Sequence, residues 1–411
     1  MANHLGTFCI KSIKPQKIEV NITATENFNF GDALSSVYPL LDIIFKYLPY
    51  NDLKSCLSVC NEWKEKAEQI LKKRTSPSWF TCYKGSKGRK GNVIAHSDNL
   101  NYSNVEIGII LYDSYRIKLN KYICLHNNIV ELSRKSIPEY LEEELVPKSV
   151  DYCLLSVPRV VSYFRNVRNA KDIQDHGSIF DGIFIPKIPH VRTVMFHCNP
   201  SKKKDIEDAT NLYIQNNEEV KCLLLFCKTQ LHESLYTFLE YLVPKNEPTS
   251  VALGGGVIRG TKTFQQINPE KKIYTVKDTV CILFLKDKTT EIDNFHAYSC
   301  VIKGNDLSKE EFNLELQKFK GNITMKEYSL GFRICCSAKY QETELQSFEE
   351  IFPKTPLLGL DAYGEIGWNC YPNANVQETD KPQKAKRVRR SKHFPNAENY
   401  FSTIFILITW D

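Results

Sequence analysis

Long hydrophobic runs are missing from this sequence of 411 residues. No run reaches the roughly 18 apolar residues that mark a membrane-spanning helix. The first residues, Met1-Ala2-Asn3-His4, are not followed by a long apolar signal segment. We therefore expect no membrane partner and no secretion, and an intracellular protein is predicted.

Motifs of metal and catalytic sites are also missing. The 14 cysteines include no CxxC pair, and neither Cys222 with Cys227 nor the adjacent Cys335 and Cys336 has the spacing of a zinc site. The nine histidines form no matching cluster. Serine, cysteine and histidine never stand in a nucleophile motif such as GxSxG. We expect no metal, no cofactor and no catalytic residue, and we interpret the cysteines as small buried hydrophobic residues of a reduced protein.

Residues 34–74 have the apolar spacing of a small helical unit. Leu40, Leu41, Ile44, Phe45 and Leu48 recur at helical intervals, Pro49 ends that stripe, and a second stripe runs from Leu53 to Leu71. A unit of roughly 40 residues rarely buries its apolar residues alone. A docking partner is therefore indicated, and the alternative is a hairpin packed on the following domain.

From Val93 onward, short apolar runs bounded by turn residues alternate with amphipathic segments. This alternation predicts a mixed α/β fold in two blocks, residues 93–268 and 269–411. The expected strands include 105–112, 152–157, 182–186, 191–196, 221–227, 279–285, 297–302, 330–337, 357–360 and 400–410. The expected helices include 138–145, 231–242, 309–319 and 341–351.

The net charge of +6 is concentrated in two segments. Residues 75–92 contain lysine, glycine and serine and are interpreted as a linker. The segment from Lys381 to Lys392 carries a dense basic run inside a loop expected at 376–396. A nuclear-import signal or a nucleic-acid patch is possible for such a run, but the absence of interleaved aromatic residues favours a solvated, mobile loop and makes nucleic acid an unlikely partner. Residues 1–33 are expected to form a flexible tail.

Two glycine-rich segments are the candidates for a binding cleft. The first is Gly254-Gly255-Gly256 after an apolar strand, and the second is Gly364-Glu365-Ile366-Gly367. Gly255 and Gly260 have the spacing of a phosphate-binding loop, but Thr261 and Lys262 stand in the wrong order for one. Both segments are predicted to be turns at the carboxyl ends of strands, where open α/β sheets form crevices. The predicted cleft residues are Gly254, Gly255, Cys336, Gly364, Glu365 and Gly367, and the alternative is a pair of structural corners.

Two sets of residues resemble known families. Leu41, Ile44 and Leu48, followed by Pro49, Asp52-Leu53 and Val59-Cys60-Asn61-Glu62-Trp63, resemble the F-box. The strand before Gly254-Gly255, the run from Gly331-Phe332 to Cys336, and Phe352-Pro353-Lys354-Thr355-Pro356 before the Gly-Glu-Ile-Gly segment resemble the FIST domain pair. The resemblance spans roughly residues 34–410 and places FIST-N-like and FIST-C-like blocks after the helical unit.

The resemblance implies a non-catalytic adaptor, the substrate-recognition subunit of an SCF E3 ubiquitin ligase. Its F-box would bind Skp1, and through Skp1 cullin-1 and the RING subunit, while the FIST blocks would recruit protein substrates for ubiquitination and proteasomal degradation. The implied Skp1-binding residues are Leu41, Ile44, Leu48, Leu53, Val59, Cys60 and Trp63, each expected to be buried only in the complex. We expect the protein in the cytoplasm and the nucleus. A small-ligand sensor that uses the FIST cleft is the alternative, and a thiol enzyme using Cys336 is a third possibility that lacks an identifiable base.

Overall fold

The computed structural model describes residues 38–84, 92–119, 122–125, 133–136, 140–147, 150–164, 178–268, 271–305, 307–339, 342–374 and 393–411. The expected tail at 1–33 and most of the expected basic loop, including Lys381 to Lys392, lie outside these residues. Helices and strands both occur throughout, and the strands form mixed sheets, so the predicted mixed α/β class is confirmed.

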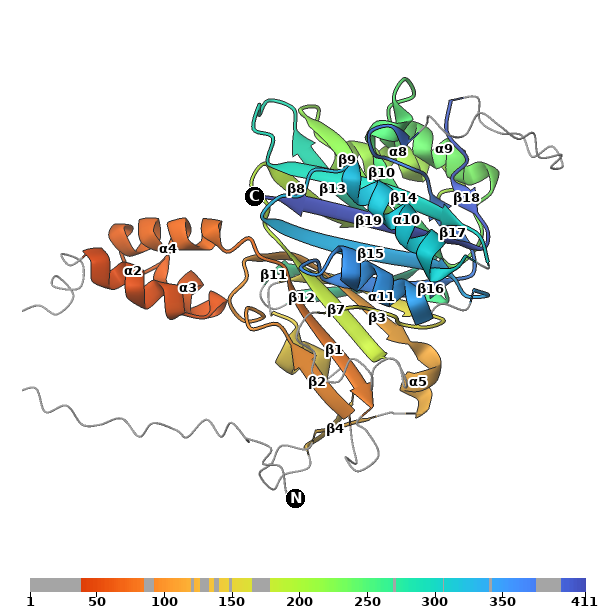
Figure 1. Cartoon of the computed structure of the whole chain (residues 1–411). Coiled ribbons are helices and arrows are strands. Elements are labelled where there is room, and N and C mark those ends of the chain that lie inside the picture. Colours follow the sequence, from red (N-terminus) through yellow and green to blue (C-terminus); the bar gives the residue numbers. More distant parts are fainter. Residues whose placement is uncertain are drawn as a thin grey trace, which may run out of the picture.

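Three helices form a unit that projects from one side of a larger body (Figure 1). They are α2 (Tyr38–Tyr47), α3 (Tyr50–Cys56) and α4 (Asn61–Lys73). Pro49 precedes α3 and has an extended backbone, because proline cannot continue the preceding helix. The unit has a small core of its own, made by Leu41, Phe45, Tyr50, Leu53, Cys56, Ala67, Ile70 and Leu71.

The body begins with a seven-stranded sheet in the order β12-β11-β6-β3-β7-β1-β2. Its strands are β1 (Ser78–Lys84), β2 (Asn92–His96), β3 (Val105–Asp113), β6 (Asp151–Val157), β7 (Ser178–Pro186), β11 (Gly260–Asn268) and β12 (Lys271–Lys277). The short elements beside it are α5 (Ser114–Leu119), a π-helix (Leu141–Leu145) and the hairpin of β4 (Tyr122–Leu125) and β5 (Ser133–Ser136).

Strand β1 corrects one expectation. It lies inside the segment 75–92 that was predicted to be a linker, and it pairs with both β2 and β7. Phe80 and Cys82 are fully buried there. Beside the basic residues that suggested a linker, the segment contains the run Trp79-Phe80-Thr81-Cys82-Tyr83, which is rich in the aromatic residues that favour strands.

A six-stranded sheet follows, in the order β18-β17-β10-β9-β13-β8. Its strands are β8 (Val191–Phe196), β9 (Glu218–Cys227), β10 (Ala252–Val257), β13 (Thr279–Asp287), β17 (Glu365–Gly367) and β18 (Glu398–Asn399). Helices α8 (Lys203–Tyr213) and α9 (Glu233–Leu242) and a 3₁₀ turn (Pro248–Ser250) connect the early strands. Strands from both sides of the expected boundary at residue 268 share this sheet, so the two expected blocks have one common core.

The third sheet has four strands in the order β14-β19-β15-β16. They are β14 (Phe295–Lys303), β19 (Ser402–Trp410), β15 (Tyr328–Cys336) and β16 (Leu357–Ala362), and β15 runs parallel to β16. The expected closing strand is confirmed as β19, which is buried along its whole length between β14 and β15.

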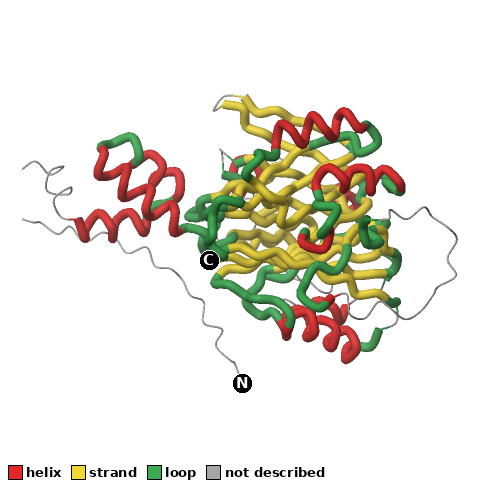
Figure 2. The backbone as a smooth tube through the Cα atoms, turned by 90° about the horizontal axis from the view of Figure 1, so that it is seen from above, coloured by secondary structure: helices red, strands yellow, loops and turns green. Residues whose placement is uncertain are grey.

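Two helices cover one face of this sheet, as Figures 1 and 2 show from two directions. They are α10 (Lys309–Gly321) and α11 (Glu342–Ile351), which pack apolar side chains on β14 and β19. Helix α10 begins with a capping box, in which the Ser308 side chain accepts from the Glu311 backbone N–H and the Glu311 side chain accepts from the Ser308 backbone N–H. The opposite face packs on β10, where the side chains of Ile334 and Ile406 lie beside Gly254.

Candidate functional site

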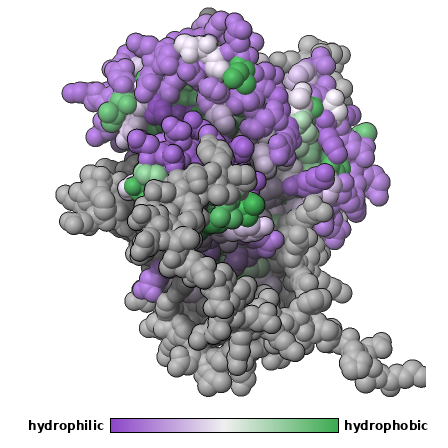
Figure 3. All heavy atoms as spheres, turned by 90° about the vertical axis from the view of Figure 1, so that its left-hand side faces the viewer, coloured by the Kyte–Doolittle hydropathy of each residue, from purple (hydrophilic) through white to green (hydrophobic). Residues whose placement is uncertain are grey.

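Helix α2 presents an apolar face to solvent. Leu40, Ile43, Ile44 and Tyr47 are 42%, 54%, 39% and 77% exposed, and we call these four residues the α2 face. Their spacing of three and four residues places them on one side of the helix. Where described residues are visible on this side of the molecule, the surface is mostly hydrophilic with small apolar patches (Figure 3). Exposed apolar faces of this kind are typical of protein-docking sites.

The seven residues predicted to bind Skp1 fall into two groups. Ile44, Val59 and Cys60 are exposed, and Leu48 and Trp63 are half-buried. Leu41 and Leu53 are 2% and 0% exposed. The expectation that these two are buried only in a complex is wrong, because they form the unit's own core.

Sequence reasoning missed three residues of the α2 face: Leu40 as a contact, Ile43 and Tyr47. The signal was available, since these residues follow one another at helical intervals on the side opposite Leu41 and Phe45. A helix that is apolar over more of its surface than a small core can bury has a second, exposed apolar face available for contacts.

Arg74 fastens the helical unit to the body. Its Nη2 donates to the carbonyl oxygens of Leu48 at 2.7 Å, Phe45 at 3.1 Å and Lys46 at 3.2 Å, which lie at the end of α2. Its Nη1 donates to the carbonyl oxygen of Tyr102, in the body, at 3.2 Å. Carbonyls at a helix end have no partners within the helix, so a guanidinium satisfies them well. Burial lowers the pKa of Arg74.

Two further hydrogen bonds strengthen this junction. The backbone N–H of Tyr50 donates to the carbonyl oxygen of Asn101 at 2.8 Å. The indole N–H of Trp410, at the end of β19, donates to the carbonyl oxygen of Thr75 at 2.8 Å. The helical unit therefore has a defined orientation relative to the body.

The two glycine-rich segments meet, but not as surface turns. Gly254, Gly255 and Gly256 lie within β10 and pair with Gly367, Ile366 and Glu365 of β17 in antiparallel register. Every one of these residues is buried. A Cβ atom at Gly255 would lie 1.9 Å from the carbonyl oxygen of Leu225, so the absence of a side chain serves close packing rather than a turn. The prediction that Gly254-Gly255-Gly256 forms a turn is wrong.

Gly364 alone keeps the expected bend, between β16 and β17. Glu365, directly after it, is 1% exposed, and its Oε2 accepts hydrogen bonds from the Ser402 N–H at 3.2 Å and the Ser402 hydroxyl at 2.9 Å. Burial raises the pKa of Glu365. The residue is an interior carboxyl, so the interpretation of this segment as a surface contact is wrong.

Cys336 lies at the end of β15, and its thiol interacts with the Glu365 carboxyl group. The thiol is half-buried, and burial together with that carboxyl raises the pKa of Cys336. A raised pKa lowers the thiolate fraction at neutral pH, and the thiolate is the nucleophilic form. The environment therefore weakens Cys336 as a nucleophile.

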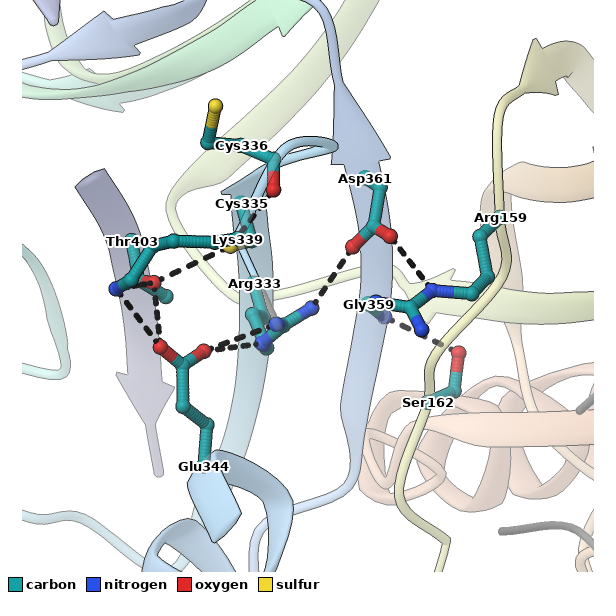
Figure 4. Close-up of polar contacts among 10 residues, drawn as sticks. All are labelled: Arg159, Ser162, Arg333, Cys335, Cys336, Lys339, Glu344, Gly359, Asp361 and Thr403. Carbon is teal, nitrogen blue, oxygen red and sulfur yellow. Dashed lines mark hydrogen bonds and ion pairs between the residues drawn. The ribbon is translucent and has the colours of Figure 1, made fainter. Parts of the chain in front are cut away.

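A network of charged side chains crosses β15 and β16 (Figure 4). Arg333 of β15 is fully buried, with Nη2 at 2.9 Å from Glu344 Oε2 and Nη1 at 3.4 Å from Asp361 Oδ1. Lys339 Nζ lies 3.0 Å from Glu344 Oε1, and Arg159 Nε lies 2.6 Å from Asp361 Oδ2. Buried charges persist only when paired and hydrogen-bonded. The sequence signal was available, since Arg333 is a lone charge in an otherwise apolar strand.

Two cavities open on the body. The larger, about 780 Å³, lies between the seven-stranded and four-stranded sheets and is lined by residues that include Trp79, Tyr328, Phe352 and Pro356. The smaller, about 360 Å³, is lined by Pro158, Arg159, Ser337, Ala338, Lys339 and Asp361. The predicted cleft residues line neither cavity, so both cavities lie away from the glycine-rich segments.

In the part of the chain that the structure describes, no group of three or more His, Cys, Asp or Glu side chains is placed to hold a metal ion. None of the described helices combines the length and the apolar character needed to cross a membrane.

Comparison with known proteins supports the F-box part of the resemblance drawn from the motifs. No family model matches the chain. F-box only protein 22 from Homo sapiens is 21% identical over 350 residues, which cover 81% of this chain and 85% of that protein. F-box only protein 22 from Pongo abelii is 20% identical over the same shares of the two chains. The similarity to F-box only protein 22 is thus confirmed across most of the length.

Proposed function

We propose that this protein is the substrate-recognition subunit of an SCF-type E3 ubiquitin ligase. The observation that carries the proposal is the α2 face, four exposed apolar side chains on one side of a helix whose other side packs into the unit's core. The similarity to proteins named F-box only protein 22 supports it. In this proposal the α2 face binds Skp1, which connects the chain to cullin-1 and the RING subunit.

The body would then hold protein substrates at a fixed position relative to the ubiquitin-charged E2. No covalent step is assigned to a residue of this chain, because holding two reactants together supplies most of what such a transfer requires. The hydrogen bonds around Arg74 support this role, since they fix the orientation of the helical unit on the body.

Skp1 capture tests the proposal directly. Replacing Ile43 and Ile44 together with Asp should abolish capture of recombinant Skp1, because a charge buried unpaired in an interface costs several kcal/mol. Both side chains are exposed in the free chain, so the variant should fold normally.

The matched control is Leu212→Asp. Leu212 lies on α8 and is 74% exposed, so the same change of chemistry is made on a helix of the body. It should leave Skp1 capture unchanged. Capture of Skp1 at wild-type yield by the Ile43/Ile44 variant would contradict the proposal.

A further inference from the structure

The smaller cavity lies at the carboxyl ends of two parallel strands. Ser337, Ala338 and Lys339 follow β15, and Asp361 is the penultimate residue of β16. Arg159 enters from the segment that runs beside β16. Carboxyl ends of parallel strands are where α/β sheets commonly bind ligands. We propose that this cavity is a binding site for a small anion, a carboxylate or a phosphate group, and that Arg159 is its main ligand-binding residue.

Arg159 is held in place from two sides. Its carbonyl oxygen accepts from the Asp361 N–H at 3.0 Å, and its Nε lies 2.6 Å from Asp361 Oδ2. The next residue, Val160, forms an antiparallel bridge with Leu360. The guanidinium therefore occupies a fixed position before any ligand arrives, which reduces the entropic cost of binding.

The outer part of the same guanidinium is available. Its side chain is 41% exposed, and within the described residues its two terminal nitrogens make no hydrogen bond. Two adjacent N–H groups in one plane match the two oxygens of a carboxylate or phosphate. Asp361 is already occupied by Arg333, so it orients Arg159 rather than competing for the ligand.

The charges around the cavity favour an anion. Arg159, Arg333 and Lys339 are three cations, and Glu344 and Asp361 are the two carboxylates that face them, which leaves one positive charge in excess. Lys339 lines the cavity and is 6% exposed, so solvent screens its charge weakly. Glu365 is the other carboxyl that interacts with Lys339, but it is buried in β17 and does not line the cavity.

The size limits the ligand class. A cavity of about 360 Å³ lies at the lower end of the range for small-molecule sites, about 300 to 1,000 Å³. It admits inorganic phosphate or a short carboxylate and excludes a folded protein segment. The site is independent of the α2 face, and its test requires no Skp1.

The test is titration of the full chain with sodium phosphate and, separately, with sodium succinate, at constant ionic strength. Calorimetry or ligand-observed NMR should report saturable binding of at least one of these probes. Binding of phosphate alone or succinate alone identifies the preferred chemistry. Each probe is titrated up to about 10 mM, a concentration high enough to detect a Kd near 1 mM. If neither probe shows saturable binding in that range, the proposal is overturned.

Arg159→Gln should weaken binding at least about tenfold, as expected for loss of a bidentate charged contact. Arg159→Lys keeps the charge and the pairing with Asp361 but removes the two adjacent N–H groups, so it should weaken binding less. This second variant keeps the site testable if Arg159→Gln does not fold. The control is Arg116→Gln, because Arg116 Nε also contacts an aspartate, Asp113, at 3.3 Å, but outside this cavity. Equal affinity of wild type, Arg159→Lys and Arg159→Gln would refute the site.

Discussion

Replacing Arg74 with Met should loosen the helical unit while leaving the body folded. The guanidinium makes four hydrogen bonds through two nitrogens, three of them to the end of α2. Hydrogen bonds to a charged group contribute about 1.5–3 kcal/mol each, and three share one nitrogen, so we expect a total loss of about 2–4 kcal/mol. Met keeps most of the aliphatic stem, so packing changes little.

Hydrogen exchange measures this loss segment by segment. Amides of 38–73 that exchange when the end of α2 separates from Arg74 should do so about 30- to 1,000-fold faster in the variant, which is the stated free-energy range at about 1.4 kcal/mol per tenfold. Amides of β9 and β19 should keep their wild-type rates, because they lie in the sheets of the body. In a reconstituted ligase, Skp1 capture should persist and ubiquitin transfer to a client should fall.

Lys72→Met is the control, since Lys72 is an exposed cation near the same end of α4. It should change neither exchange nor transfer. If exchange in 38–73 is the same in the Arg74 variant as in wild type, the reasoning that Arg74 fixes the unit's orientation is refuted.

Three other perturbations have clear expectations. Gly255→Ala should prevent folding, because its Cβ would lie 1.9 Å from a backbone oxygen of β9. Gly260→Ala should fold, because its Cβ would have no atom within 4 Å. Circular dichroism and solubility distinguish the two variants. Burial raises the pKa of Asp181 from 3.8 to about 6, so ionisation of this carboxyl lowers the stability of the fold as pH rises through that range. In chemical denaturation from pH 4 to 7, the free energy of unfolding of Asp181→Asn should therefore rise relative to that of wild type. A difference between the two that does not change with pH would contradict this. Arg333→Met should lower the free energy of unfolding by about 3–5 kcal/mol, against about 1 kcal/mol for the partly exposed Arg192→Met; equal losses in thermal denaturation would show that burial does not decide the effect.

Local patterns in the sequence were sufficient for elements with local causes. The helix expected at 309–319 is α10, because its capping residues and apolar spacing lie within the same few residues. The expected strand at 400–410 is β19, because a long apolar run that follows turn residues is typical of a buried strand. Such elements need no information from the rest of the chain.

The errors have non-local causes. Gly254, Gly255 and Gly256 suggested a turn because glycine favours turns, but the reason for them lies in Ile406, Leu225 and other distant side chains and backbone that approach β10. Strand β13 inserts between β9 and β8, an order that no local pattern encodes. The smaller cavity depends in the same way on Arg159 meeting a strand some 200 residues later, since Arg159 and Asp361 are 202 residues apart.

The hydrogen bond from Trp410 to Thr75 has a consequence for biosynthesis. These residues are 335 positions apart, so the contact joins one of the first described segments to leave the ribosome with the last. The helical unit can fold on its own early core, but β19 must emerge before the four-stranded sheet has its inner strand and before this anchor forms. A prematurely terminated chain would therefore expose the α2 face without a finished body, so such fragments would occupy the partner of that face unproductively unless they are degraded.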